Sequence, residues 1–417
     1  MTAHAVFPTL PPVAPPGPRF AAWAAAARAV ADRLTETAAA RDAAGRPPVA
    51  EVQLLREAGL LTIAIPADLG GGGASVTEIL RIIRILAEGD TSIAQLASYH
   101  FFGSTLALRG ANRALAEKRL NGLLHRGWFH AGIAQAAYEP LIEARATAGG
   151  FVLNGAKPFT SGAAVADSLH VWVRFATGTV IDGQDAGGHI GQFIVANPSP
   201  GLSFGDDWDN IGQRLTVSGS AALKNVAVGR DDLVQHYPEA TEHPPHVTVH
   251  VPLIQLAFAE LYVGTARGAL AATRDYVHAH GRPWVTSPAL AAGDDVLVIE
   301  RFGRLSAALA SAEALADAAG AVLQQAIAQG EALTEAGRGH AAAVAYQAKI
   351  HATEVALEVT SRLFELTGAR STARSFALDR FWRNVRTHST HDPVHYKVIE
   401  VGDWALNGRD PAPTYYS

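Results

Sequence analysis

The segment "GGFVLNGAKPFTSGAAVADSLHVWVRF" (residues 149–175) is built from short runs of apolar and β-branched residues that glycine and proline separate. This texture is typical of β-strands joined by tight turns. Similar pieces extend on both sides of it, among them "GQFIVANPSPGLSF" and "SAALKNVAV". The sequence therefore predicts a small, β-barrel-like domain at residues 128–240, in the middle of the chain.

The segments on either side of this β domain carry a helical pattern. Apolar residues recur at helical spacing in "AAWAAAARAVADRLTETAAARDA" before it, and three long alanine-rich amphipathic segments follow after residue 245. We expect an N-terminal helical domain at residues 1–127, with a flexible, proline-rich arm at 1–19, and a C-terminal four-helix bundle at residues 241–417.

A glycine cluster, "PADLGGGGAS" (residues 66–75), interrupts the N-terminal helical pattern. Neither Lys-Ser/Thr nor a strand–helix unit in GxGxxG register accompanies it, so neither a Walker nor a Rossmann phosphate loop is indicated. We predict a loop there, followed by one helix over residues 76–100.

The charge and composition limit the partners. The net charge of -5 over 417 residues offers no basic face for nucleic acid. The N-terminus lacks the pattern of a signal peptide, and no uncharged stretch is long enough to cross a membrane. We therefore expect a cytoplasmic protein whose partners are small molecules and copies of itself.

Sulfur-containing residues are almost absent: the chain has no cysteine, and its single methionine is Met1. The lack of cysteine excludes disulfides, thiolate metal sites and a cysteine nucleophile. We hypothesise that the protein is made when sulfur is scarce, although the codon bias of a GC-rich genome would also reduce these residues.

Three segments resemble the acyl-CoA dehydrogenase superfamily in the expected order. They are residues 65–100, residues 149–175 and "DNIGQRLTVSGSAALKNVAVGRDDLV" (residues 209–234). The resemblance implies a flavin held between the β domain and the helical bundle, in a homotetramer whose neighbouring subunit helps to bind it.

The stretch "RFWRNVRTHSTHDP" (residues 380–393) indicates the branch. In the dehydrogenases a catalytic glutamate precedes a glycine in this region; here Asp392-Pro393 takes that place, with a side chain one methylene shorter, which weakens the dehydrogenase interpretation. The stretch more closely resembles the two-component flavin-dependent monooxygenases, similar to dibenzothiophene, alkanesulfinate and sulfone monooxygenases. "HGRPW", with Arg282 and Trp284, matches a second motif of that group.

This resemblance implies that His391 and His388 act on a C4a-hydroperoxyflavin, because histidine can supply or relay a proton near neutral pH. Tyr99 and His100 are further candidates for the wall of the pocket. Other interpretations remain open: the histidines can be structural or form a metal site, although a third ligand at diagnostic spacing is missing and we predict no metal. Tyr99 and His100 can equally be packing residues.

The resemblance also places Ser161 and Gln135 beside the flavin ring, although both also suit ordinary turns. Near the phosphate we expect Arg370 and Ser371, with Arg282 and Trp284, since arginine binds phosphate oxygens bidentately. We therefore predict FMN rather than FAD. No dinucleotide fingerprint is present, so a separate NAD(P)H:flavin reductase is expected to supply FMNH2.

The predicted function is oxygenation of a small organosulfur compound by O2 for sulfur acquisition. An alkanesulfinate is favoured, followed by a sulfone or a dibenzothiophene-like compound. The alternatives are an FAD-dependent acyl-CoA dehydrogenase, an amine or phenol hydroxylase of the same fold, and a catalytically idle flavin-binding protein.

Overall fold

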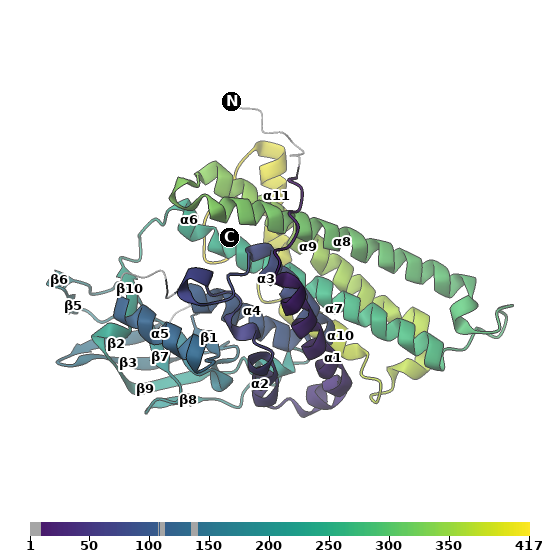
Figure 1. Ribbon diagram of the computed structural model, residues 1–417, viewed down its shortest axis with the longest axis horizontal. Coiled ribbons are helices and arrows are strands. Elements are labelled where there is room, and N and C mark those ends of the chain that lie inside the picture. The colour runs from purple at the N-terminus through teal and green to yellow at the C-terminus, as the bar shows by residue number, and fades with distance from the viewer. Residues whose placement is uncertain (1–9, 107, 109–112, 135–140) are drawn as a thin grey trace.

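The computed structural model describes residues 10–106, 108, 113–134 and 141–417. Helices come first, strands follow, and long helices complete the chain (Figure 1). This is the order that the sequence predicted. The positions of the domain boundaries stay predictions.

The N-terminal part contains five α-helices: α1 (Phe20–Ala44), α2 (Val49–Glu57), α3 (Val76–Gly89), α4 (Thr91–Leu106) and α5 (Arg113–His125). The single helix predicted over residues 76–100 is wrong, because the chain breaks at Asp90. Asp90 is extended (φ -158°, ψ 113°), and its carboxylate accepts from the backbone N–H groups of Ser92 and Ile93. This side chain caps α4 and lets it leave at a new angle.

The glycine cluster forms a loop, as predicted. At Gly71 a Cβ atom would lie 2.2 Å from the carbonyl oxygen of Ile65. The close approach of two backbone segments explains why a residue without a side chain stands there.

The β domain is one mixed sheet with the order β10-β7-β4-β2-β3-β9-β8, and β1 pairs with β4 beside this path. Its strands are β1 (His130–Ile133), β2 (Ile142–Thr147), β3 (Gly150–Lys157), β4 (Ser168–Phe175), β7 (Ile190–Ala196), β8 (Leu202–Phe204), β9 (Ala221–Val228) and β10 (Leu233–Tyr237); β5 (Val180–Ile181) and β6 (Gln184–Asp185) form a separate hairpin. Strands β1 and β2 both run parallel to β4, one after the other along its length.

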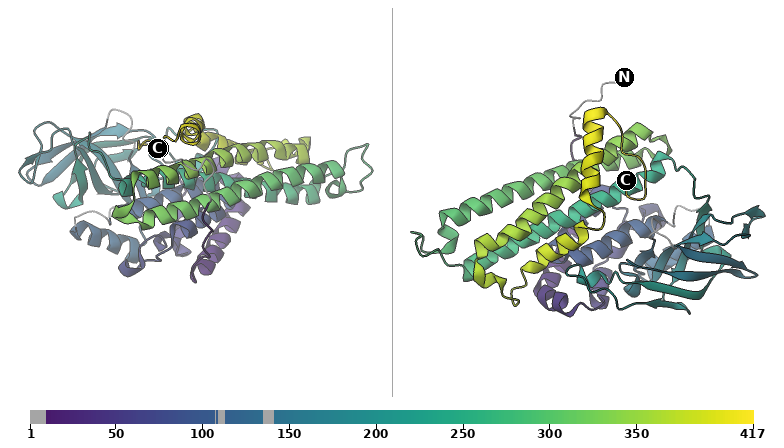
Figure 2. Two further views of the ribbon diagram at one scale, coloured as in Figure 1. Left: turned by 90° about the horizontal axis from the view of Figure 1, so that it is seen from above. Right: turned by 180° about the vertical axis from the view of Figure 1, so that it is seen from behind.

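The C-terminal part consists of α6 (Pro245–Thr248), α7 (His250–His280), α8 (Val296–Ala328), α9 (Glu335–Thr367), α10 (Asp379–Ser389) and α11 (Val394–Asn407). The helices α7, α8 and α9 pack side by side, and α11 crosses them (Figure 2). The connection between α7 and α8 lies at the end of the bundle far from the sheet (Figure 1).

Two helical segments, Pro245–His280 and Val296–Ala328, are long and apolar enough to cross a membrane by length and composition alone. In the first, 72% of the most apolar window is buried inside the protein. The helix α7 packs against α3, α8 and α9, so its apolar residues belong to the core.

Candidate active site

The helices α10, which carries His388 and is followed by His391, and α4, which carries Tyr99, meet beside a loop of the β domain. Asn384 and His388 lie one turn apart on α10, while Ser92 and Tyr99 lie two turns apart on α4. Gln213 of the loop joins both faces: its backbone N–H donates to Asn384 Oδ1 (2.7 Å), and its Oε1 accepts from Ser92 Oγ (2.7 Å). The loop thus fixes the two helices where the bundle meets the β domain.

The structure brings His388 and His391 together. Their rings are stacked, with centroids 5.9 Å apart and an angle of 17° between the planes. The ring of Phe258, on α7, presents its edge or face to both, at 4.6 and 5.3 Å between centroids. The spacing of three residues in the sequence therefore does produce one histidine pair.

The two histidines differ in their surroundings. His388 is buried, and burial holds its pKa well below the ordinary value, so the ring is neutral. Its Nδ1 is bonded to the hydroxyl of Tyr262 (2.9 Å), while its buried Nε2 has no partner among the residues that the structure describes. The side chain of His391 is 41% exposed, so this ring is the one that a solvent-borne ligand can reach.

Asp392 connects His391 to the bundle. Its Oδ1 lies 3.3 Å from His391 Nδ1, and its Oδ2 accepts from Lys349 Nζ on α9 (2.5 Å). Burial alone would raise the pKa of this carboxyl group, but the hydrogen bond to His391 and the charge of Lys349 hold it well below its usual range. Asp392 is therefore an ionised acceptor.

Tyr99 faces the same cluster from α4. Its ring lies 6.4 Å from that of Phe258, edge to face, and its hydroxyl accepts from Gln95 Nε2 (3.3 Å). Burial raises the pKa of Tyr99 to about 12, so the hydroxyl keeps its proton. Gln95, which the sequence interpretation missed, is buried, and its Oε1 lacks a partner within the described chain. The only sequence signal for it is its spacing of four residues from Tyr99.

His100 lies away from this cluster, which corrects its assignment as a catalytic candidate. It is fully buried and stacks on Phe129 at 5.2 Å. Its Nδ1 accepts from the backbone N–H of His130 (2.9 Å), so its Nε2 carries the proton and donates to the carbonyl of Leu61 (2.7 Å). Burial lowers the pKa of His100 to about 4. Both ring nitrogens of His100 thus have partners inside the protein. Because adjacent residues of a helix face different directions, His100 points away from the cluster that Tyr99 contacts.

The β domain contributes a chain of hydroxyl groups next to Gln213. Ser161 Oγ lies 2.6 Å from Ser218 Oγ, which lies 2.7 Å from Thr216 Oγ1. Thr216 Oγ1 donates to the carbonyl of Gln213 (2.8 Å). Ser161 is half-buried, so the outer end of this chain can exchange its bond to Ser218 for one to a ligand.

Two aromatic residues that the sequence interpretation missed stand beside this chain. Phe159 is 60% exposed and meets Trp208 edge to face at 6.3 Å, while Trp208 Nε1 donates to the carbonyl of Gln213 (2.8 Å). Phe159, Gln213 and Val217 all have positive φ (58°, 52° and 40°), an unfavourable conformation for residues with side chains. Such strain gathers at ligand sites.

The atoms without partners test whether a flavin ring fits here. His388 Nε2, Gln95 Oε1 and Gln213 Nε2 are all buried and unpaired in the described residues, on the two helices and the loop that meet at this junction. An exposed aromatic side chain stands next to them. A flat ring system that both donates and accepts hydrogen bonds would satisfy them, so these residues fit the expected flavin ring.

The residues predicted to hold the phosphate lie elsewhere in the chain. Arg282 and Trp284 follow α7, and Arg370 follows α9; all three are exposed, Trp284 to 74%. The connection after α7 and the end of α9 lie at the end of the bundle far from the sheet (Figure 1), whereas Ser161 belongs to the β domain, between β3 and β4.

Ser371 and Gln135 have different outcomes. Ser371 is buried, and its Oγ bonds the hydroxyl of Thr367 and the carbonyl of Gly368, both at 2.7 Å, so its hydroxyl is already in use. It does line an open hollow of about 380 Å³ together with Phe364, Thr372, Arg374 and Asp379. Gln135 lies outside the described residues.

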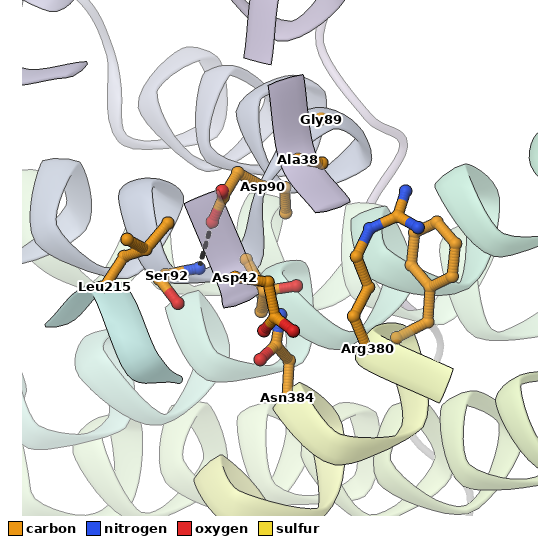
Figure 3. A pocket seen from close by; sticks show the side chains of 11 residues that line it. Ala38, Asp42, Gly89, Asp90, Ser92, Leu215, Arg380 and Asn384 are labelled. Atoms are coloured by element: carbon orange, nitrogen blue, oxygen red, sulfur yellow. Dashed lines mark hydrogen bonds between the residues drawn. The ribbon is translucent and has the colours of Figure 1, made fainter. Parts of the chain in front are cut away.

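A second, much smaller cavity lies behind Asn384. Figure 3 shows Asn384 beneath Asp42, with Asp90 and Ser92 beside them. Its volume of about 10 Å³ has room for no more than a water molecule. Arg383, from the quoted motif, donates to Asp42 at 2.6 Å and so joins α10 to α1. These charged residues serve packing between helices.

Comparison with known protein families gives two matches. The model described as the C-terminal domain of acyl-CoA dehydrogenase matches residues 256–396, and the N-terminal domain of the same family matches residues 21–126.

Individual relatives cover nearly the whole chain. Dibenzothiophene monooxygenase of Mycolicibacterium goodii is 35% identical over 94% of this chain and 95% of its own. A probable FMNH2-dependent monooxygenase, SfnC of Pseudomonas putida, is 35% identical over 97% and 98%. The structure of methanesulfinate monooxygenase MsuC from Pseudomonas fluorescens superimposes with a TM-score of 0.86, at 33% identity over 94% and 99%.

Proposed function

Because the chain belongs to the acyl-CoA dehydrogenase family, and within it to the flavin-dependent monooxygenases, we propose that it uses reduced FMN to transfer one oxygen atom from O2 to a small organosulfur compound. The predicted family, fold class and cofactor are thereby confirmed at the level of the group. The substrate and the roles of single residues are proposals.

The observation that carries this proposal is the pairing of the carboxylates. An acyl-CoA dehydrogenase needs a free carboxylate to remove an α-proton. Asp392 is bonded to Lys349 at 2.5 Å, and Glu260, two residues before Tyr262 on α7, is bonded to Arg84 at 2.6 and 3.0 Å. Among the residues that the structure describes, the groups left open at the junction are imidazole, amide and phenol groups, which suit proton transfer to oxygen better than the removal of a C–H proton.

Reduced FMN, when bound, supplies the electrons with which O2 is activated. The protein has to exclude water, orient the reactants and deliver a proton. His391 is suited to take up that proton at Nε2 and pass it on, because its Nδ1 keeps its own proton towards Asp392. His388 stacks behind it as a neutral ring, and Tyr99 supplies a hydroxyl that stays protonated, held by Gln95.

We propose a homotetramer in which the phosphate end of each flavin site comes from a second copy. Arg282 and Trp284 follow α7 and Arg370 follows α9, at the end of the bundle far from the sheet (Figure 1), and all three are exposed, whereas Ser161 lies between β3 and β4 of the β domain. Two copies packed through their bundles can bring these ends together, which one chain does not. Exposed apolar side chains at the same end, such as Leu290 (97%) and Val296 (72%), suit such a contact.

For the substrate we propose an alkanesulfinate, with a sulfone or a dibenzothiophene-like compound next. Relatives are named for methanesulfinate and dibenzothiophene, and a chain with no cysteine and a single methionine suits a cell that lacks sulfur. A cytoplasmic NAD(P)H:flavin reductase supplies the reduced cofactor.

The test combines the purified protein with a flavin reductase, NADH, FMN and O2, and screens alkanesulfinates, sulfones, thiophenes, amines and phenols for oxygenated product. An oxygenated organosulfur product supports the proposal. A hydroxylated amine or phenol would redirect it, and bleaching of bound FAD by an acyl-CoA without O2 would replace it with a dehydrogenase. Tight flavin binding without substrate-dependent oxygen use would indicate an idle flavin-binding protein.

A further inference from the structure

A buried lysine lies beneath the histidine pair, and neither the sequence motifs nor the proposed function assigns it a role. Lys349 of α9 is 1% exposed. Its Nζ donates to Asp392 Oδ2 at 2.5 Å and to Gln255 Oε1, and it lies 5.5 Å from the centroid of Phe258, the ring that both His388 and His391 contact. In the described part of the chain, the ammonium group that contacts Asp392 thus comes from α9, whereas Asp392 lies in the turn between α10 and α11.

The two oxygens of Asp392 have separate tasks. Oδ2 is held by Lys349, which fixes the rotation of the carboxylate and leaves Oδ1 directed at His391 Nδ1. A carboxylate beside one ring nitrogen keeps the proton on that nitrogen and leaves the other free. The residue that fixes the carboxylate thus also fixes the tautomer of the histidine.

The contribution of this pair to stability gives little reason for its presence. A buried ion pair is costly to desolvate, and apolar residues of similar volume often replace one without loss. A second buried lysine of the bundle, Lys397, forms an ion pair that contacts no histidine in the described residues. It bonds Glu400 at 3.1 Å and lies 4.2 Å from the centroid of the Tyr346 ring. Only the Lys349 pair continues to a histidine that is open to solvent.

We propose that Lys349 is a positioning residue, which acts through Asp392 to hold His391 with its proton on Nδ1 and its Nε2 directed to the reacting oxygen. The inference rests on the proposed function for its catalytic part. Its structural part concerns the protein without flavin and can be measured separately.

The first measurement is ¹⁵N NMR of the histidine rings in flavin-free protein, above the pH range in which histidine titrates. The His391 signals are assigned by their loss in His391→Gln. Wild type should show one tautomer with Nδ1 protonated. Lys349→Met and Asp392→Leu should both give a mixture of tautomers, and Lys397→Met should keep the wild-type signals. An unchanged tautomer in Lys349→Met would overturn the proposal.

The second measurement is the product formed per O2 consumed. Lys349→Met should lower it by about tenfold, the loss typical of a group that orients a functional histidine. If Lys349 acts only through Asp392, adding Lys349→Met to Asp392→Leu should cause no further loss; losses that multiply would contradict the proposal.

The double variant also guards against a failure to fold, because it leaves no unpaired charge in the interior. If Lys349→Met alone does not fold, the double variant should still show the tautomer mixture and the tenfold loss relative to Lys397→Met, and wild-type behaviour would overturn the proposal. If neither the wild type nor any variant oxygenates a substrate, the proposed function is wrong. The NMR result still decides the role of Lys349 in that case.

Discussion

Two of the buried ionic networks in the described part of the chain differ in how completely the polar atoms around them are paired. Around Arg84, the guanidinium group bonds Glu260 at 2.6 and 3.0 Å, Glu313 at 3.0 Å and Asp317 at 2.7 Å. Around Asp392, the nearby atoms His388 Nε2 and Gln95 Oε1 are buried without a partner in the described part of the chain. One network is complete, and the other has free positions.

This difference distinguishes a network that only holds helices together from a network that can bind a ligand. The complete network around Arg84 joins α3, α7 and α8. Removal of one of its charged side chains leaves another buried charge without its partner in an apolar interior. Unpaired buried atoms are costly, so they persist in a folded protein where a ligand completes them. The following predictions test that distinction, from the largest expected effect to the smallest.

The largest effect should come from breaking the complete network. Arg84→Met leaves Glu260 buried without its partner, and we expect it to lower the free energy of unfolding by about 3–5 kcal/mol. Denaturant unfolding followed by circular dichroism measures this loss. Arg81→Met is the matched control, because Arg81 lies one turn earlier on α3 and makes a single, more exposed contact with Asp317 (3.3 Å). Equal losses in both variants would contradict the distinction.

Breaking the incomplete network should affect chemistry and leave the fold intact. In His391→Ala we expect an oxygenation yield on the order of 10²-fold lower, with the consumed O2 released as hydrogen peroxide, because the variant lacks the ring that we propose to deliver the proton. FMN binding and the unfolding midpoint should stay close to wild type, since the side chain is 41% exposed.

The measurement is product and peroxide per NADH consumed in the reductase-coupled assay. His388→Ala should show a milder loss of yield and also a loss of stability, because it is buried against Tyr262. Normal coupling in His391→Ala would show that the histidine pair is structural and would transfer the role to Tyr99.

His100, whose two ring nitrogens both have hydrogen-bond partners, should affect the stability of the fold, as the complete network around Arg84 does. The pKa of His100 is about 4 in the folded protein, and that of an unfolded histidine is about 6.5. Between these two pH values, His100 binds a proton in the unfolded chain but stays neutral in the folded protein. The stability that His100 contributes is therefore fully present above pH 6.5 and is lost as the pH falls towards 4.

His100→Gln should therefore reduce the slope of unfolding free energy against pH in this window by up to about 1.4 kcal/mol per pH unit. Other buried histidines, such as His130, keep their own contributions. His395→Gln, a substitution at an exposed position, is the control variant with which this slope is compared. A wild-type slope in His100→Gln would show that its burial does not govern acid sensitivity.

The sequence predicted those features that local patterns encode. Helical spacing gave the long helices, and a spacing of three residues gave the stacked pair of His388 and His391. Lys349 was missed because it lies 43 residues from Asp392, and Tyr262 because it lies 126 residues from His388. Contacts at such distances leave no periodic signal in one sequence. Tyr99 and His100 were predicted as candidates together because they are adjacent in the sequence. Tyr99 lies in the cluster, whereas His100 faces the core, because adjacent residues of a helix point in different directions.

The smallest effect should come from the exposed end of the bundle, which we propose to complete the flavin site of a second copy. Arg282→Ala should weaken the binding of reduced FMN by about tenfold, because one charge-assisted bond to phosphate is lost. Arg274→Ala is the control, because Arg274 is another exposed arginine, in the C-terminal part of α7, and pairs with Asp275 at 2.9 Å. Anaerobic titration at physiological salt measures both, since a phosphate contact on a surface weakens with salt. Dilution below the dissociation constant of the proposed tetramer should remove the difference between Arg282→Ala and wild type, because the lone chain keeps Ser161 but lacks the arginine of its neighbour. Full affinity in a monomer would show that a single chain holds the whole flavin.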